Sequence, residues 1–298
     1  VGTFTSLFAA VIACTQTDIK RVLAFSTISQ IGLMMGGLGV SGYSGPEGLG
    51  YTASMFHLFN HAMFKALLFL CAGSVIHAVH TNELWDMGGL KKHLPVTHIA
   101  FLIGCLGISG VPPLSGFFSK DEILWQTFAG GKTLLWLLAL LTAGLTAFYI
   151  FRLVFSVFFG DSRVDKKVAG HVHESPKVMT IPLMVLAALS VLGGALLAGD
   201  WIVEWLAPVV GEEAHHEPPI PALAITGLVV AVVAIGVAAA FVLVGKREVP
   251  REAPQDVSFA TKAAGADLQR RIGQPLFIGL LAVIDKGEER DSPEIKAV

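Results

Sequence analysis

The chain has 298 residues, of which 53% are hydrophobic and 15% are charged, and its formal net charge is -2. This apolar content exceeds what the core of a water-soluble protein requires, which excludes an ordinary soluble domain and predicts a membrane protein. The basic residues lie in several short loops and do not form one patch, which argues against nucleic acid as a partner.

Apolar stretches recur along the chain at lengths that suit a bilayer, whose core of about 30 Å takes roughly 20 residues of helix. We expect spans at about 1 to 15, 22 to 40, 51 to 79, 98 to 128, 133 to 159, 178 to 199 and 220 to 244. The predicted fold class is an all-α, polytopic transmembrane helical bundle. We expect residues 1–244 to form the transmembrane domain and 245–298 a polar C-terminal tail, in which the apolar run 275–284 suits an interfacial helix.

The loops between these spans carry charge unevenly. One alternate set holds Lys20, Arg21, Lys91, Lys92, Arg163, Lys166, Lys167, Lys177, Lys246, Arg247 and Arg251. In the other set, around 41 to 50, 129 to 132 and 200 to 219, the only basic residue is Lys132. Because Lys and Arg accumulate on the cytoplasmic side, the asymmetry predicts that the first set is cytoplasmic and supports the number of spans.

Few residues suit a metal or a disulfide. The cysteines sit singly inside apolar runs, without paired spacing, and we interpret them as packing residues: Cys14, Cys71 and Cys105. The histidines near His171 and the pair His215 and His216 lie in polar loops without convergent ligands. We therefore predict no metal site.

The helix expected at 51 to 79 carries ionisable groups on one face. His57, His61 and Lys65 are spaced by four residues, and Asn60 extends the same stripe. At about 1.5 Å per residue, Lys65 lies about 21 Å along the helix, near the middle of the bilayer. An ammonium there must lie in the bundle interior or a hydrated cavity, where burial favours the neutral amine. The stripe predicts a proton relay; the alternative is a polar cluster that fixes helix packing.

The next expected span is interrupted at its centre. Gly110, Pro112, Pro113 and Gly116 disturb the helical ladder, which predicts a helix broken near 110–116. Such breaks expose half-helix ends that bind or pass ions.

A lysine with two carboxylates follows this break. Lys120, Asp121 and Glu122 lie on the half-helix that leads towards the side with few basic residues. We interpret the lysine as part of a proton path, with an interfacial charge cluster as the alternative.

Two further groups of polar residues lie inside expected spans. Ser26, Thr27, Ser29 and Gln30 form a polar patch that could hold water for proton transfer or bond to another helix. Arg152 lies near the cytoplasmic end of its helix, and we expect it to extend towards the headgroups.

Four segments, in order and spacing, resemble the proton-translocating subunit L (chain 5) family of NADH:quinone oxidoreductase, complex I: TQTDIKRVLAFSTISQIG, FHLFNHAMFKALLFL, WDMGGLKKHLP and SGVPPLSGFFSKDEIL. The resemblance is specific from Val1 to about Arg152 and weaker to about Val244. It implies an antiporter-like module built from inverted five-helix repeats, of which the later repeat lies here. We therefore expect that an N-terminal half, with its glutamate and lysine pair, and a final span are missing from this sequence.

The resemblance also implies roles for individual residues. Those implied for the proton pathway are His57, His61, Lys65, Lys120 and Asp121. Accessory residues would be Asp18, Lys20, Asn60 and Glu122. The first three pathway residues match the family's relay before the broken helix, and Lys120 matches its terminal lysine.

From these features we predict proton translocation across a bacterial inner membrane by a multi-pass subunit of NADH:quinone oxidoreductase. The expected partners are other membrane subunits, lipid, protons and internal water. No residue set here suits a cofactor, so NAD, FMN, iron–sulfur clusters and quinone are expected in partner subunits. The alternatives are an Mrp-type sodium/proton antiporter subunit, a related hydrogenase or bicarbonate-complex subunit, and, from a different class, a structural membrane scaffold.

Overall fold

The computed structural model describes residues 1–40, 49–197, 201–210 and 222–245, and their regular structure is helical, as predicted. The helices are α1 (Gly2–Thr15), α2 (Ile19–Val40), α3 (Leu49–Val79), α4 (Pro95–Ser109), α5 (Ser115–Ala129), α6 (Thr133–Phe158), α7 (Lys166–Ala169), α8 (Lys177–Leu197), α9 (Trp201–Val210) and α10 (Ala222–Ala240). Two 3-10 turns, Leu84–Asp86 and Leu90–Lys92, precede α4, and a π-helical turn, Phe241–Gly245, continues α10. The tail from 246 and the pair His215 and His216 lie outside the described residues.

Several helices have the length and composition of membrane spans. Among the described residues, five are long and apolar enough to cross a bilayer: α2, α3, α6, α8 and α10 with its π-helical turn. The apolar helices α1 and α4 are shorter. The outer face of α8 leaves Val178, Ile181 and Met184 exposed, which suits a surface in contact with lipid and not with water. The protein is therefore an integral, multi-pass membrane protein.

The segment expected as one interrupted span consists of two helices. α4 ends at Ser109, and its C-cap, Gly110, has a φ of 78°, a left-handed conformation that glycine adopts without steric cost. α5 begins at Ser115. A Cβ placed on Gly116 would lie 1.9 Å from the carbonyl oxygen of Gly107, so the two helices approach each other backbone to backbone. This close approach holds the two half-helices beside one another.

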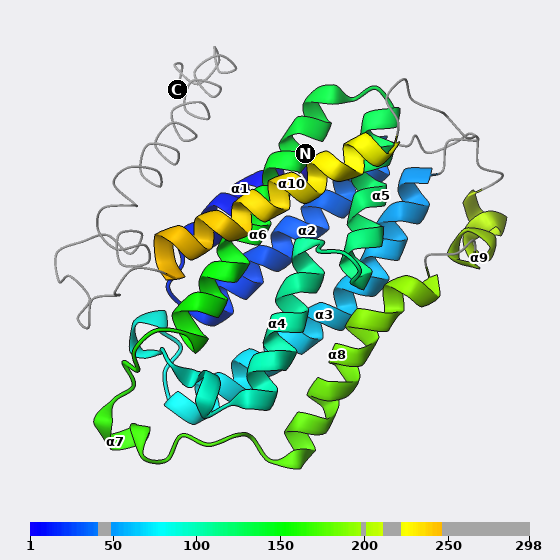
Figure 1. Ribbon diagram of the computed structural model, residues 1–298. Helices are drawn as coiled ribbons and strands as arrows, with labels where there is room; N and C mark the ends of the chain where they lie inside the picture. Colours follow the sequence, from blue (N-terminus) through cyan, green and yellow to red (C-terminus); the bar gives the residue numbers. More distant parts are fainter. Residues whose placement is uncertain (41–48, 198–200, 211–221, 246–298) are drawn as a thin grey trace, which may run out of the picture.

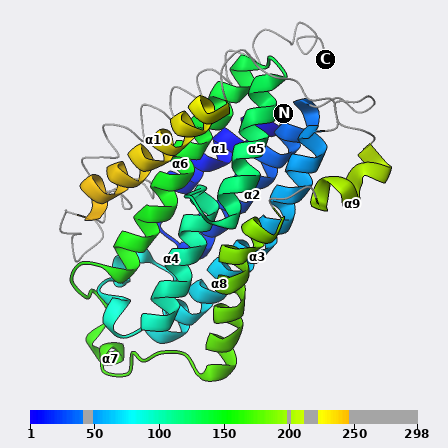
Figure 2. The same ribbon diagram turned by 45° about the vertical axis from the view of Figure 1, so that its right-hand side comes forward.

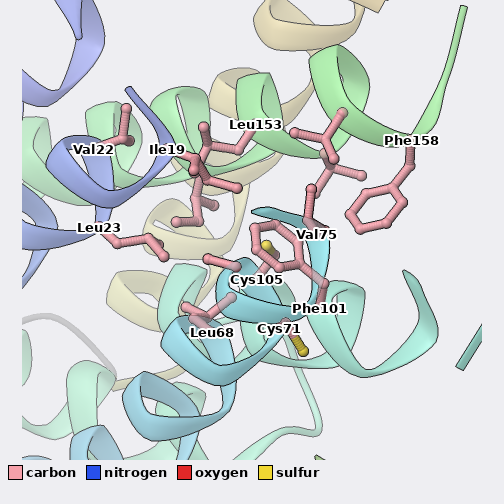
Figure 3. Close-up of a cluster of buried hydrophobic side chains, with 14 of the residues drawn as sticks. Ile19, Val22, Leu23, Leu68, Cys71, Val75, Phe101, Cys105, Leu153 and Phe158 are labelled. Carbon is pink, nitrogen blue, oxygen red and sulfur yellow. The ribbon is translucent and has the colours of Figure 1, made fainter. Parts of the chain in front are cut away.

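The largest apolar core lies where α1, α2, α3, α4 and α6 meet. Figure 3 shows side chains of this core from α2, α3, α4 and α6, among them Ile19, Leu23, Leu68, Cys71, Val75, Phe101, Cys105, Leu153 and Phe158. Cys71 and Cys105 are wholly buried there, as expected of packing residues. Figure 2 shows α8 beside α3 and α4, so that α3 is covered by other helices along much of its length.

The basic loops gather at one end of the bundle, opposite the turn between α5 and α6 (Figure 1). The amide of Leu84 donates to the carbonyl of Thr17 at 2.9 Å, and the amide of Gly89 donates to Phe159 at 3.2 Å. The Arg163 guanidinium donates to three carbonyls of the same segments. These contacts join the three described basic loops and agree with the charge asymmetry of the sequence.

The N-terminus of α4 receives its cap from a distant residue. Its own N-cap position is Leu94, which has no side chain able to accept a hydrogen bond. Glu174, in the loop before α8, accepts from the amides of Val96 at 2.8 Å and Thr97 at 3.1 Å, and from the Thr97 hydroxyl at 2.6 Å. A carboxylate satisfies these amides and complements the positive end of the helix dipole.

The prediction for Arg152 is wrong. This side chain is wholly buried and donates to the carbonyl of Gln16, where α1 ends, so it does not extend towards the headgroups. The segment that joins α1 to α2 covers this part of α6, and that neighbour is not visible from the position of Arg152 in its own helix.

Candidate functional site

The inner face of α3 carries the ionisable stripe into the bundle. His57, Asn60, His61 and Lys65 are each at most 6% exposed. α3 packs against α2, α4, α5 and α8, which surround the stripe. The i, i+3, i+4 spacing on one helix therefore becomes a row of buried polar groups.

At one end of the row, Lys65 forms a hydrogen bond with a residue of α2. Its Nζ donates to the Ser26 hydroxyl at 2.7 Å and lies 5.5 Å from the centre of the Phe69 ring. The hydroxyl of the wholly buried Tyr149 in α6 lies within hydrogen-bonding reach of Ser26. Among the described residues, Ser26 is the hydrogen-bond partner of this buried amine, and burial makes its charged form costly.

In the middle of the row, the His57 ring joins α2 to α5. Its Nε2 lies 3.1 Å from Oε1 of Gln30, and its Nδ1 lies 2.8 Å from the Ser119 hydroxyl. The His57 and His61 ring centres are 6.2 Å apart. Nε2 of His61 is buried and has no hydrogen-bond partner among the described residues. The two histidines thus lie between the Lys65 end and α5.

At the other end, Lys120 is buried next to the break. It is 2% exposed, and its Nζ lies 3.5 Å from the carbonyl oxygen of Ile108 in the last turn of α4. The negative end of a half-helix dipole favours a cation at this place. Lys120 also lies close enough to His57 for the two to interact electrostatically. Lys120 is thus a buried side chain beside the break.

The two carboxylates after Lys120 face other partners. Asp121 accepts a hydrogen bond from the Thr226 hydroxyl in α10 at 2.7 Å, while its second oxygen is buried without a partner among the described residues. Glu122 accepts from the Gln126 amide on its own helix at 2.6 Å. Asp121 therefore connects the lysine-bearing helix to the outer helix α10.

The accessory candidates have different surroundings. Asn60 donates to the carbonyl of Ser115 at 3.3 Å and so belongs to the buried row. Asp18 instead caps α2, where its Oδ1 accepts from the amides of Lys20 at 2.7 Å and Arg21 at 3.1 Å. The Lys20 side chain is exposed. Asp18 and Lys20 thus lie at the basic end of the bundle, and the structure does not bring them to the row.

Three residues of the polar patch of α2 bond to other helices, which is one of the two interpretations of its sequence. Ser26 and Gln30, one turn apart, face Lys65 and His57. Ser29 faces α1, where it and Ser6 each donate to the carbonyl of the other, at 2.9 and 2.7 Å. Only the first pair belongs to the site.

Sequence reasoning did not assign Ser119, Thr146 or Tyr149 to the site. Thr146 accepts from the Gln30 amide at 3.3 Å and lies 3.5 Å from the Tyr149 hydroxyl. A signal was available, because Ser115 with Ser119 and Thr142 with Thr146 are polar pairs one turn apart on their helices.

The described residues hold no group of three or more His, Cys, Asp or Glu side chains that could bind a metal ion. The row itself consists of titratable and hydroxyl side chains, groups that can exchange protons.

Buried lysines and histidines beside a broken transmembrane helix define the class of ion-translocating, antiporter-like membrane proteins. Residues 1–146 match the family described as "NADH:quinone oxidoreductase/Mrp antiporter, TM". The resemblance to subunit L is confirmed by this match and by the relatives of the chain.

Three relatives illustrate the match. The chain is 45% identical over 305 residues to the NADH-quinone oxidoreductase subunit L of Mycobacterium tuberculosis. This alignment covers 96% of this chain and 46% of the relative. It is 45% identical over 227 residues to the NAD(P)H-quinone oxidoreductase chain 5 of Picosynechococcus, with 67% and 33% covered. It is 47% identical over 205 residues to the F(420)H(2) dehydrogenase subunit L of Methanosarcina mazei, with 65% and 30% covered. The chain thus spans less than half the length of these relatives.

Two solved structures share the fold. The Mrp complex from Dietzia sp. matches with a TM-score of 0.60 and 23% identity, over 70% of this chain and 47% of that one. An archaeal membrane-bound sulfane sulfur reductase matches with a TM-score of 0.67 and 23% identity, over 99% of this chain and 52% of that one.

Proposed function

We propose that this chain carries protons across a bacterial inner membrane as a membrane subunit of NADH:quinone oxidoreductase. The names of its relatives, subunit L and chain 5, support this assignment. Redox chemistry, with NAD, FMN, iron–sulfur clusters and quinone, belongs in this proposal to partner subunits. Other membrane subunits, the bilayer and internal water are the remaining partners.

One observation carries the proposal: two lysines are buried inside the bundle with polar side chains between them. Lys65 donates to Ser26, and His57 contacts Ser119, which directly precedes Lys120. A charged amine in such a place is costly, so each lysine can alternate between its ammonium and its amine. We propose that protons pass along Lys65, His61 and His57 to Lys120 and leave on the side opposite the basic loops.

Repulsion between two charged lysines would couple the protonation of one to that of the other. Two ammonium groups about 8 Å apart repel by about 2 kcal/mol at an effective dielectric constant of about 20. A change of one pKa unit corresponds to about 1.4 kcal/mol. A proton that reaches Lys65 can therefore favour release of a proton from Lys120.

Substitution of Lys120 tests the proposal in the assembled complex. Lys120→Ala removes the terminal amine, and we expect fewer protons pumped per NADH oxidised, measured in sealed proteoliposomes. Lys132→Ala is the matched control, because Lys132 is exposed in the turn before α6. If Lys120→Ala pumps with the same ratio as the control, the role of Lys120 is refuted.

A second candidate is an Mrp-type sodium/proton antiporter subunit. The matching family includes both kinds of protein, and the Mrp complex shares the fold. The two are separated by purification in mild detergent: quinone-reductase subunits should accompany the chain in one case and antiporter subunits in the other. Proton movement that requires a sodium gradient and no NADH would favour the antiporter.

A further inference from the structure

The two ring nitrogens of His57 face different helices. Nε2 lies 3.1 Å from Gln30 Oε1 on α2, the helix that also binds Lys65 through Ser26. Nδ1 lies 2.8 Å from the Ser119 hydroxyl on α5, next to Lys120. Because each hydrogen bond needs one donor and one acceptor, the neighbours of the ring determine which nitrogen carries its hydrogen.

The direction of the Gln30 carboxamide follows from Thr146. The Thr146 hydroxyl donates to the carbonyl of Thr142 at 2.8 Å, and a carbonyl can only accept. The oxygen of Thr146 is then an acceptor for the Gln30 group 3.3 Å away, which must be the NH₂. While Thr146 donates to Thr142, turning the carboxamide over would place two acceptors against each other. The carbonyl oxygen of Gln30 therefore faces His57.

This orientation assigns the hydrogen of His57. Gln30 Oε1 accepts, so Nε2 is the donor, and the neutral ring leaves Nδ1 bare in front of Ser119. We propose that Gln30 holds His57 in the Nε2–H tautomer, so that His57 releases the transported proton at Nδ1, through Ser119, on the Lys120 side. Gln30 is a positioning residue in this scheme and Ser119 a relay residue; the inference rests on the proposed function.

Ser119 can form hydrogen bonds that suit both the neutral and the charged ring of His57. When His57 is neutral, the Ser119 hydroxyl donates to Nδ1 at 2.8 Å. When His57 is an imidazolium, Nδ1–H donates to Ser119, and the hydroxyl hydrogen can turn to the carbonyl of Ser115, 3.4 Å away on the same helix. Neither state leaves a buried hydrogen-bonding group without a partner, which keeps the cost of alternation low.

The discharge step balances in atoms and charge. The Nδ1–H bond of the imidazolium breaks and an O–H bond forms on Ser119, whose former hydrogen passes through internal water to the free amine of Lys120. Lys120 becomes an ammonium and His57 becomes neutral. The 3.5 Å contact between Lys120 Nζ and Ile108 is long for a hydrogen bond, so it restrains the lysine only weakly.

The hydrogen bond to Gln30 also occupies Nε2, the second nitrogen of the His57 ring. While Nε2–H is held by Gln30, the ring cannot accept a proton at that nitrogen, which lies towards the helix that binds Lys65. Uptake from the Lys65 side therefore requires the Gln30 contact to break and the ring to turn, so that the bare Nδ1 faces that side. In the arrangement that the structure shows, His57 can exchange a proton on the Lys120 side and cannot do so on the Lys65 side.

The tautomer is tested directly by nitrogen-15 NMR of the assembled complex with labelled histidine in this chain alone. The His57 signals are identified by their loss in His57→Gln. We expect a protonated Nε2 and a bare Nδ1 in the neutral ring, and a mixture of both tautomers in Gln30→Leu. A hydrogen found on Nδ1 of the unsubstituted chain overturns the proposal, and so does an unchanged tautomer in Gln30→Leu.

Proton pumping tests the relay through Ser119. Ser119→Ala should slow proton transfer about tenfold or more, while Ser119→Thr, which keeps the hydroxyl, should retain it. Ser74→Ala is the matched control, because it removes a buried hydroxyl of α3 that has no hydrogen-bond partner among the described residues. If Ser119→Ala pumps normally while Lys120→Ala does not, the relay is refuted and the proposed function stands. If both pump normally, the proposed function fails as well.

Discussion

Replacing Glu174 with alanine tests how the half-helix α4 is held in place. The substitution leaves the amides of Val96 and Thr97 without their acceptor and removes a negative charge from the start of the helix. Loss of an N-cap costs about 0.5 to 2 kcal/mol, and loss of a charge near the dipole costs about 0.3 to 1 kcal/mol. We therefore expect Glu174→Ala to destabilise the protein by about 1 to 3 kcal/mol.

The expected loss can be measured from the exposure of buried thiols. Cys71 and Cys105 are wholly buried, so a thiol-reactive dye reports unfolding of the chain in mild detergent as temperature rises. At about 2 to 4 °C per kcal/mol, the apparent Tm should fall by several degrees. Glu204→Ala is the control, because Glu204 is exposed on α9. Equal Tm values for the two variants would refute the assignment of Glu174 as the cap of α4.

Two further predictions concern the break and its neighbour α10. Gly116→Ala should sharply reduce the yield and Tm of folded protein, because its Cβ would lie 1.9 Å from the backbone of Gly107; Gly73→Ala, whose Cβ meets nothing within 4 Å, should be tolerated. A normal Tm for Gly116→Ala would contradict the close approach. Thr226→Val removes the hydrogen bond to Asp121 and leaves a half-buried carboxylate without a donor, at a cost of about 1 to 3 kcal/mol. Pumping per NADH should fall in this variant and recover in Thr226→Ser, and equal ratios in all three chains would show that the contact has no part in transport.

Periodicity within one helix made part of the structure predictable. The spacing of His57, His61 and Lys65 indicated a shared face, and the structure buries all three on it. Gly110 and the prolines after it indicated where the helix would end, because their backbone effects are local. Such features depend on residues a few positions apart, which a sequence displays directly.

Contacts between helices were not predictable in the same way. Gln30 meets His57 and Thr146, and Glu174 meets Thr97, only because the packing of whole helices brings distant positions together. Arg152 shows the same limit, since its burial depends on the segment that ends α1. A polar residue in an apolar helix indicates that a partner exists, but its identity comes from packing.

The number of protons pumped per electron pair in sealed vesicles that hold the assembled complex tests the central claim most directly. Lys65→Leu keeps the volume of the side chain close to that of lysine and removes the amine that binds Ser26. We predict that the ratio falls while NADH still reduces quinone, and that Lys91→Leu, on an exposed loop lysine, leaves the ratio unchanged. An unchanged ratio in Lys65→Leu would contradict transport through the buried row.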